Sequence, residues 1–289
     1  MVILDCTDFN ITIVGLGLIG GSFAMALKEL KPRNLWAIDI DKEVLETAEK
    51  MNIIDKGYTN PEIPLNNSDI VILAVYPQKT INFVKNNMNL FKSGAVITDT
   101  AGIKSNLLKE IMPVLREDLD FIGGHPMAGK EESGLKAATK DMFRNANYIL
   151  TPINGNKEGN INLITEIARG MGCKKVVHLT PEKHDDIIAY TSQLPHVIAV
   201  SLIDCNSSIM GVSQFIGGSF KDTTRVATIN GELWPELLLY NEENIISKIE
   251  DFEQNIKGIK DAIINHDEAF LKKRFENATK KRKEIRKGV

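Results

Sequence analysis

Several features that mark specialised classes of protein are scarce in this sequence. Its three cysteines, Cys6, Cys173 and Cys205, are too few and too scattered for a disulfide framework or a metal-ligand set. No apolar run approaches the roughly 18 residues of a membrane span. The amino terminus also lacks the basic and apolar regions of a secretory signal. These absences predict a protein of the reducing cytoplasm, with no metal site and no membrane partner.

An excess of charge of one sign is lacking as well. The formal net charge is −3, which gives no electrostatic reason to expect a nucleic-acid partner. The apolar and charged fractions, 43% and 25%, are those of an ordinary globular chain. A length of 289 residues is enough for one large or two medium domains with a substantial core.

A glycine-rich turn near the amino terminus is the first informative feature that is present. An apolar run at residues 10–14 leads into Gly-Leu-Gly-Leu-Ile-Gly-Gly-Ser at residues 15–22, and a helical pattern follows. Gly15 permits the tight turn, Gly17 lets the backbone approach a pyrophosphate, and Gly20 lets the helix pack closely on the strand. The motif predicts a dinucleotide bound at the amino end of that helix.

An acidic residue follows at the distance typical of this type of site. A second predicted strand, residues 34–40, contains Asp39, about 20 residues beyond the last motif glycine. A carboxylate there accepts hydrogen bonds from ribose hydroxyls and repels a 2′-phosphate, so the sequence predicts NAD rather than NADP. The alternative is a glycine turn beside an unrelated surface aspartate.

Further strands alternate with helices. The sequence predicts strands at residues 68–75, 94–99, 121–124, 147–151 and 174–179. Continuous apolar runs of this kind are typical of parallel strands that are buried on both faces of a sheet. We expect Ser105 to cap a helix over residues 106–115. The carboxyl ends of the strands should meet the glycine turn along one edge of the sheet.

A histidine follows one of these strands. Residues 121–129 read Phe-Ile-Gly-Gly-His-Pro-Met-Ala-Gly. A residue before proline is disfavoured in the helical conformation, so we expect His125 to be held in extended backbone at the strand tip. A single histidine is usually structural. The predicted position next to a bound nicotinamide makes His125 a candidate for acid–base chemistry.

The second part of the sequence is helical almost throughout. Thr180-Pro181 is a typical helix start. We therefore predict an α/β, Rossmann-like dinucleotide-binding domain over residues 1–179, followed by an all-helical substrate-binding and dimerisation domain over residues 180–289. Within the helix predicted at residues 184–202, Pro195 should cause a kink that bares polar groups around His196.

Two patterns in the helical part suggest contacts. Residues 217–225 predict a glycine hinge, and two interpretations stay open: a solvent loop with an Asp222–Arg225 pair, or an Arg225 that binds a carboxylate. Six apolar residues then step alternately by four and three positions: Ile245, Ile249, Phe252, Ile256, Ile259 and Ile263. This seam favours contact with a second subunit over an internal core helix. The basic tail at residues 272–287 is expected to be solvated.

Taken together, these motifs resemble the prephenate dehydrogenase family over nearly the whole chain. The resemblance rests on residues 15–22, on Gly-Gly-His-Pro-Met-Ala-Gly at 123–129, His-Asp at 184–185, Leu-Pro-His at 194–196, Phe-Lys-Asp-Thr-Thr-Arg at 220–225, and Trp234. It implies a cytoplasmic, NAD-dependent oxidoreductase of tyrosine and aromatic amino acid biosynthesis. Such an enzyme decarboxylates prephenate oxidatively to 4-hydroxyphenylpyruvate. It also implies a homodimer formed through the C-terminal helices.

The resemblance also implies a role for individual residues. His125 matches the family's catalytic histidine, and Arg225 matches the arginine that holds a substrate carboxylate. The matching substrate-pocket positions are His196, Gly218, Glu131, Asp222 and Trp234, of which Glu131 and Asp222 would form an ionic network with the arginine. The cofactor-binding positions are Gly15, Leu16, Gly17, Leu18, Ile19, Gly20, Asp39, Ala74, Val75, Tyr76, Thr100, Ala101 and Gly102.

Two positions depart from the family pattern. Gly102 stands where the family commonly has a serine whose hydroxyl bonds the catalytic histidine or the substrate. Gln193 replaces a histidine that is frequent two residues before Pro195. Neither change removes the central histidine or arginine. Arogenate dehydrogenase, which performs the same chemistry on the amino analogue, is therefore the nearest alternative function.

Two further alternatives lie outside this activity. A hydroxy-acid dehydrogenase with a helical second domain would use a catalytic lysine and leave the motif around His125 without a role. A catalytically silent NAD-binding sensor would fit the absence of the serine, but the retention of His125 and Arg225 argues against it. No regulatory domain is recognised, so we expect any feedback inhibition by tyrosine to act at the active site itself.

Overall fold

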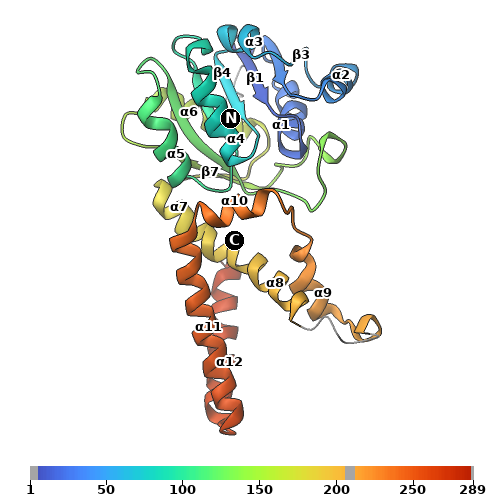
Figure 1. Ribbon diagram of the computed structural model, residues 1–289, viewed down its shortest axis with the longest axis vertical. Helices are drawn as coiled ribbons and strands as arrows, with labels where there is room; N and C mark the ends of the chain where they lie inside the picture. The colour runs from blue at the N-terminus through green and yellow to red at the C-terminus, as the bar shows by residue number, and fades with distance from the viewer. Residues whose placement is uncertain (1–5, 206–211, 288–289) are drawn as a thin grey trace. The chain divides into compact units, whose positions relative to one another are not determined.

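The computed structural model describes residues 6–205 and 212–287 (Figure 1). The chain divides into two compact units, Met1–Asn241 and Glu242–Val289. The first unit contains the sheet together with the first helices of the C-terminal half. The domain boundary that the sequence places after Leu179 remains a prediction.

An eight-stranded sheet forms the centre of the first unit, in the order β3-β2-β1-β4-β5-β6-β7-β8. The strands β1 to β6 are parallel, β7 is antiparallel to β6, and β8 is parallel to β7. Their bounds are β1 Asn10–Val14, β2 Asn34–Ile38, β3 Lys56–Tyr58, β4 Ile70–Leu73, β5 Val96–Asp99, β6 Asp120–Pro126, β7 Asn147–Thr151 and β8 Lys175–His178. The predicted α/β class is confirmed.

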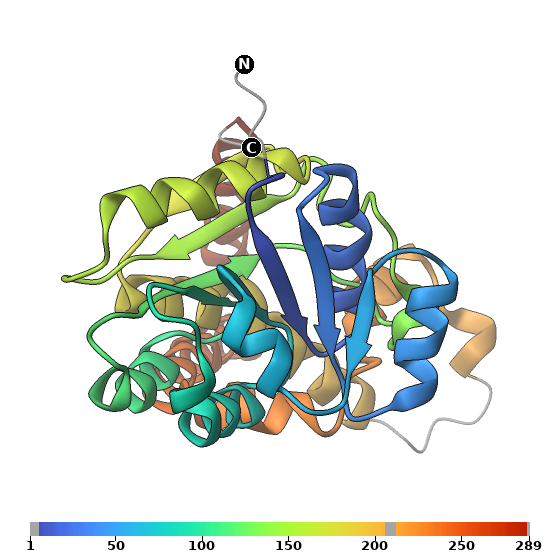
Figure 2. The ribbon, with the colours of Figure 1, turned by 90° about the horizontal axis from the view of Figure 1, so that it is seen from above.

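Helices cover both faces of this sheet (Figure 2). Alternate residues of β4 show why: Ile70 and Ile72 pack into one core with α1 and α6, while Val71 and Leu73 pack into the other with α3, α4 and α5. The helices of this part are α1 Leu18–Glu29, α2 Lys42–Lys50, α3 Glu62–Asn67, α4 Pro77–Asn87, α5 Ser105–Ile111 and α6 Glu158–Gly170. A strand that is apolar on both faces thus supports the three-layer architecture.

The cap of α5 differs from the expectation. Ser105 is the first residue of the helix, and its side chain does not cap it. The carboxylate of Asp185 accepts hydrogen bonds from the backbone N–H groups of Lys104 (2.9 Å) and Ser105 (2.8 Å). The local prediction was wrong because a residue 80 positions away supplies the acceptor. The helix also ends earlier than predicted, in a 3-10 turn at Met112–Val114.

Three helical elements run on from one another after β8: α7 (Pro181–Ile188), a π-helix (Ala189–Gln193) and α8 (Leu194–Asp204). Thr180 caps α7 as predicted, because its hydroxyl accepts the N–H of Lys183 (3.3 Å). In place of a simple proline kink, the chain widens into the π-turn just before Pro195, a residue that has no N–H to donate.

This helical run also corrects one expectation about composition. The helical run Pro181–Asp204 contains an 18-residue window with a mean hydropathy of 1.2, which by length and composition is enough to cross a membrane. The sequence expectation that no such segment exists was therefore wrong. Core helices of soluble proteins pass the same test, so this composition alone is weak evidence for a membrane span.

Short helices complete the first unit: α9 (Gly218–Thr224), a 3-10 turn (Arg225–Ala227) and α10 (Leu233–Leu239). The segment expected to be a glycine hinge is therefore mostly helical. The backbone N–H of Gln78 donates to Glu236 (3.0 Å), and this bond ties α10 to the start of α4.

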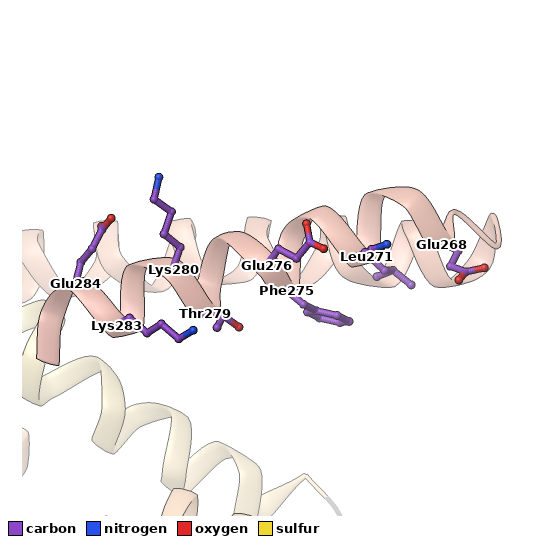
Figure 3. A pocket seen from close by; sticks show the side chains of 9 residues that line it. Glu268, Leu271, Phe275, Glu276, Thr279, Lys280, Lys283 and Glu284 are labelled. Carbon is purple, nitrogen blue, oxygen red and sulfur yellow. The ribbon is translucent and has the colours of Figure 1, made fainter.

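The second unit consists of two long helices, α11 (Glu242–Ile264) and α12 (Glu268–Lys287). The predicted seam lies on α11, where Ile256 and Ile263 are 50% and 59% exposed. On α12, Leu271 and Phe275 project from the same side of the helix along a shallow groove (Figure 3). Apolar side chains thus remain open to solvent on both helices. The basic tail is largely exposed, as expected.

We expect Gly20→Ala to destabilise the first unit. A Cβ at this position would lie 1.8 Å from the carbonyl oxygen of Gly15, so α1 would have to move away from β1. Overpacking of this kind costs about 1–3 kcal/mol of unfolding free energy. The matched control is Gly17→Ala, whose Cβ would meet no atom within 4 Å. Thermal unfolding of both variants tests this, and equal midpoints would contradict it.

Candidate active site

A cavity of about 600 Å³ opens at the carboxyl ends of the parallel strands. It is lined by residues 17–19 of the glycine turn, 74–77 after β4, 100–102 after β5, and 125–134 of β6 and the following loop. Ser192, His196, Arg225, Trp234 and Leu237 line it from the helical segments. The strand ends that the sequence places along one edge of the sheet do meet here.

His125 is the penultimate residue of β6, at the carboxyl end of the strand as predicted. The strand pairs with β5 through Asp120–Ile122 and then with β7 through Gly123–Pro126. The second half of β6 therefore extends past the end of β5 while remaining hydrogen-bonded to an antiparallel neighbour. This extension holds the histidine rigidly at the edge of the cavity.

The glycine turn has the geometry that a dinucleotide phosphate needs. Gly15 has φ +89°, which glycine adopts readily, and the space next to Gly17 is open. The helix α1 begins at Leu18 without a side-chain cap, so its first N–H groups remain available to an anion. The carboxylate of Asp39 accepts the N–H of Leu16 (2.7 Å), which fixes this acidic residue beside the turn.

Two histidines and a carboxylate form a hydrogen-bonded row behind the cavity. Nδ1 of His125 lies 2.8 Å from Nε2 of His184, and Nδ1 of His184 lies 2.7 Å from Oδ1 of Asp185. Burial lowers the pKa of His125 well below its usual value, and the neighbouring His184 and Lys104 side chains lower it further. His125 is therefore neutral at neutral pH, as a proton acceptor must be.

A buried ion pair lies beneath this row. The ammonium group of Lys104 bonds the carboxylate of Asp99, and both side chains are fully buried. Asp99 also accepts the backbone N–H groups of Ala101 (2.8 Å) and Gly124 (3.1 Å). Burial lowers the pKa of Lys104, and the neighbouring Asp99 opposes that shift. The pair holds the end of β5 against β6, directly before His125.

The opposite side of the cavity carries cationic and aromatic groups. The guanidinium of Arg225 forms an ion pair with Glu131, and both side chains remain partly exposed. The rings of His196 and Trp234 lie 3.9 Å apart between centroids, at an interplanar angle of 31°. Nδ1 of His196 lies 2.8 Å from the carbonyl of Ser192 and so must carry the donated proton. Burial lowers the pKa of His196.

Not every expected site residue lines this cavity. Gly218 begins α9, and Asp222 is exposed on the same helix; neither lines the cavity. Among the ion pairs of the described residues, Arg225 is paired with Glu131 and not with Asp222. Of the expected cofactor positions, Gly15, Leu16, Gly20 and Asp39 are not among the residues that line the cavity; Asp39 is half-exposed beside the turn.

Sequence reasoning gave no role to several residues that the structure brings together here. Lys104 was given no role, and the His-Asp motif at residues 184–185 was quoted for the resemblance without a role for either residue. Gln193 is buried; its amide donates to the carbonyl of Leu237 (2.7 Å) and accepts from Asn241 (2.8 Å). The glutamine that replaces the family's usual histidine thus joins α10 to the π-turn.

Comparison with known proteins agrees with this arrangement. Residues 23–187 match the family described as prephenate dehydrogenase, nucleotide-binding domain, and residues 180–277 match prephenate dehydrogenase, dimerization domain. The prephenate dehydrogenase of Bacillus subtilis is 31% identical, over 97% of this chain and 76% of the relative. The cyclohexadienyl dehydrogenase of Zymomonas mobilis is 30% identical, over 94% of each chain.

Solved structures give the same result. Prephenate dehydrogenase from Aquifex aeolicus, in complex with hydroxyphenyl propionate and NAD+, superposes with a TM-score of 0.88 at 30% identity, covering 96% of this chain and 98% of that one. Arogenate dehydrogenase from Synechocystis shares the fold, with a TM-score of 0.82 at 24% identity over 95% and 99% of the two chains. Matches over both halves show that this chain belongs to the prephenate dehydrogenase family.

Proposed function

We propose that this protein oxidatively decarboxylates prephenate to 4-hydroxyphenylpyruvate with NAD, as the resemblance in the sequence implies. One observation carries the proposal: a neutral histidine and an arginine open onto one cavity beside a dinucleotide-type glycine turn. A dianionic substrate with a hydroxyl group needs both a proton acceptor and a cationic anchor. Relatives at 30% identity or more include prephenate and cyclohexadienyl dehydrogenases, and this favours prephenate as the substrate.

The proposed cofactor site uses the residues along the sheet edge. The turn at residues 15–20 would hold the pyrophosphate, and Asp39 would bind the adenosine ribose. Residues 74–76 and 100–102 would border the rest of the dinucleotide. NAD, when bound, takes up the hydride from the ring carbon that carries the hydroxyl group.

His125 handles the hydroxyl proton in this proposal. Its Nε2 accepts the proton while the ring carbon is oxidised. The ring carboxylate then leaves as carbon dioxide, its bonding electrons make the ring aromatic, and the oxygen takes the proton back from Nε2. No proton is released overall, so the histidine must both accept and return it. A neutral imidazole can do both.

Arg225 anchors the substrate in this proposal. Its guanidinium faces the cavity and is paired with Glu131. A substrate carboxylate would replace Glu131 as the partner and gain two parallel hydrogen bonds from the planar fork. His196 and Trp234 would form the wall beside it.

We also propose that the enzyme is a cytoplasmic homodimer, formed through its C-terminal helices. The match to the family's dimerization domain supports this, since it extends through α11 into α12. The exposed apolar residues of the seam on α11 and of the groove on α12 are suited to burial against a second copy. The free thiols of Cys173 and Cys205 are consistent with a reducing compartment.

The first test is turnover of prephenate with NAD by wild type and by His125→Asn. We expect NADH formation by wild type, and a fall in kcat of about 10²–10⁴-fold in the variant, as for other general acid–base residues. The lowered pKa of His125 keeps its neutral form dominant near neutral pH, so wild-type kcat should fall only at acidic pH. Arogenate and NADP serve as comparison substrates. No wild-type turnover on either acid would reject the function.

Arg225→Ala should raise KM for prephenate more than it lowers kcat. Removing the anchor costs about 2 kcal/mol or more, which corresponds to about 30-fold in KM. Arg225→Lys should fall between wild type and the alanine variant, because lysine keeps the charge and loses the fork. The control is Lys221→Ala on the exposed side of α9. Steady-state kinetics decide, and an unchanged KM would contradict the role of Arg225.

Ile256→Glu should weaken the proposed dimer. The substitution places a charge in the apolar seam, and we expect the dimer dissociation constant to rise by at least about 10-fold. Gln254→Glu adds the same charge to α11 outside the seam and should leave the assembly unchanged. Sedimentation velocity over a range of concentrations measures both variants. Equal behaviour of the two would exclude the seam from the interface.

A further inference from the structure

The row formed by His125, His184 and Asp185 has properties that the proposed reaction does not yet use. His184 and Asp185 are 0% and 1% exposed, so they cannot touch the substrate directly. Their hydrogen bonds of 2.8 Å and 2.7 Å connect Nδ1 of His125 to a carboxylate through one imidazole ring. Both residues belong to α7, while His125 belongs to β6.

The hydrogen bonds determine where the protons lie. An ionised carboxylate only accepts, so Nδ1 of His184 carries a proton and donates it to Asp185. In the neutral ring Nε2 of His184 then has a free lone pair, and Nδ1 of His125 must donate to it. The remaining nitrogen of His125, Nε2, is therefore an acceptor. It has no hydrogen-bond partner among the described parts of the chain, and His125 borders the cavity.

The carboxylate of Asp185 is held rigidly in this arrangement. Its two oxygens accept the N–H groups of Lys104 and Ser105, in addition to the bond from His184. The side-chain amide of Asn241 donates to the backbone carbonyl of Asp185 (2.9 Å). Every polar atom of the aspartate side chain thus has a fixed partner, as the orienting member of a catalytic row requires.

Charged groups lie near the row at the end of β5 and in the segment that follows it. Lys104, from the segment after β5, affects both histidines, and Asp99, at the end of β5, acts on His184. These two groups are paired with each other and leave little net charge. Among the described residues, Asp185 is therefore the remaining anion next to His184, and a positive charge on that ring would be matched by it.

Gly102 leaves His125 without the hydroxyl partner that is common in the family. A Cβ at this position would lie 3.9 Å from Cε1 of His125, so a serine there would approach the ring directly. With glycine, the bond to His184 is the hydrogen bond that orients His125 among the described residues. The task of orienting the ring therefore falls to α7.

We propose that His184, held by Asp185, is the positioning residue for His125 and a proton relay behind it. This inference rests on the proposed function. As the substrate O–H bond breaks, its proton forms an N–H bond at Nε2 of His125, and the Nδ1 proton of His125 passes to Nε2 of His184. The resulting imidazolium of His184 faces the carboxylate of Asp185. Both protons return when the phenolic O–H of the product forms.

The test compares His184→Gln with wild type on prephenate and NAD. A glutamine carbonyl can still accept the Nδ1 proton of His125 as a hydrogen bond, but it cannot take the proton over. We expect kcat to fall by about 10- to 100-fold, as when other partners of a functional histidine are removed, with KM nearly unchanged. His178→Gln is the matched control. His178 lies at the end of β8, outside the cavity, and is hydrogen-bonded to Thr165 of α6.

A second readout separates the relay from a structural effect. The dependence of kcat on the deuterium content of the solvent should be curved in wild type, because two protons move, and linear in His184→Gln. Asp185→Asn should reduce kcat in the same direction. If it does not fold, His184→Gln still decides, with NAD affinity measured to show an intact cofactor site.

Two results would overturn the relay. The first is wild-type kcat in His184→Gln, and the second is a linear solvent dependence in wild type. Failure of the proposed function is a separate outcome, since wild type would then turn over neither prephenate nor arogenate. A fall in the kcat of the variant together with a linear solvent dependence, with wild type active and NAD still bound, supports the relay.

Discussion

The buried carboxylate of Asp185 is the point through which the two halves of the active site are joined. It accepts hydrogen bonds from the backbone at the start of α5, on the nucleotide-binding side, while its own helix, α7, begins the helical part of the chain. The same carboxylate binds His184, which bonds His125 on β6. A charge buried in this way would be costly without partners, and here the partners come from the start of α5 and from α7 itself.

The sequence predicted the fold class and the strand ends that meet at the cavity, because these depend on local patterns. The glycine turn, the apolar strands and the His-Pro pair each have a short-range signature, and all of them line or support one cavity. The antiparallel direction of β7 has no such signature. The cap of α5 was wrongly assigned to Ser105 for the same reason. The carboxylate that accepts the first N–H groups of the helix belongs to Asp185, which is near in space and far in sequence.

The two departures from the family pattern have different consequences. Gln193 has a structural role, because its side-chain amide hydrogen-bonds α10 and Asn241 and so links both to the π-helix. Gly102, in contrast, borders the cavity and changes what surrounds His125. Sequence comparison alone gives both positions equal weight, and only the hydrogen-bond partners separate a structural replacement from one at the site of chemistry.

The open space at Gly102 also bears on how such enzymes diverge. The nearest atom to a Cβ there is 3.5 Å away, on Leu237, and the backbone is not in the left-handed region, so the fold does not require glycine. A single codon change could introduce a hydroxyl without repacking. Related enzymes could therefore switch between a histidine oriented by a serine hydroxyl at this position and one oriented by His184 in a single substitution. No variant along that route would lose the fold.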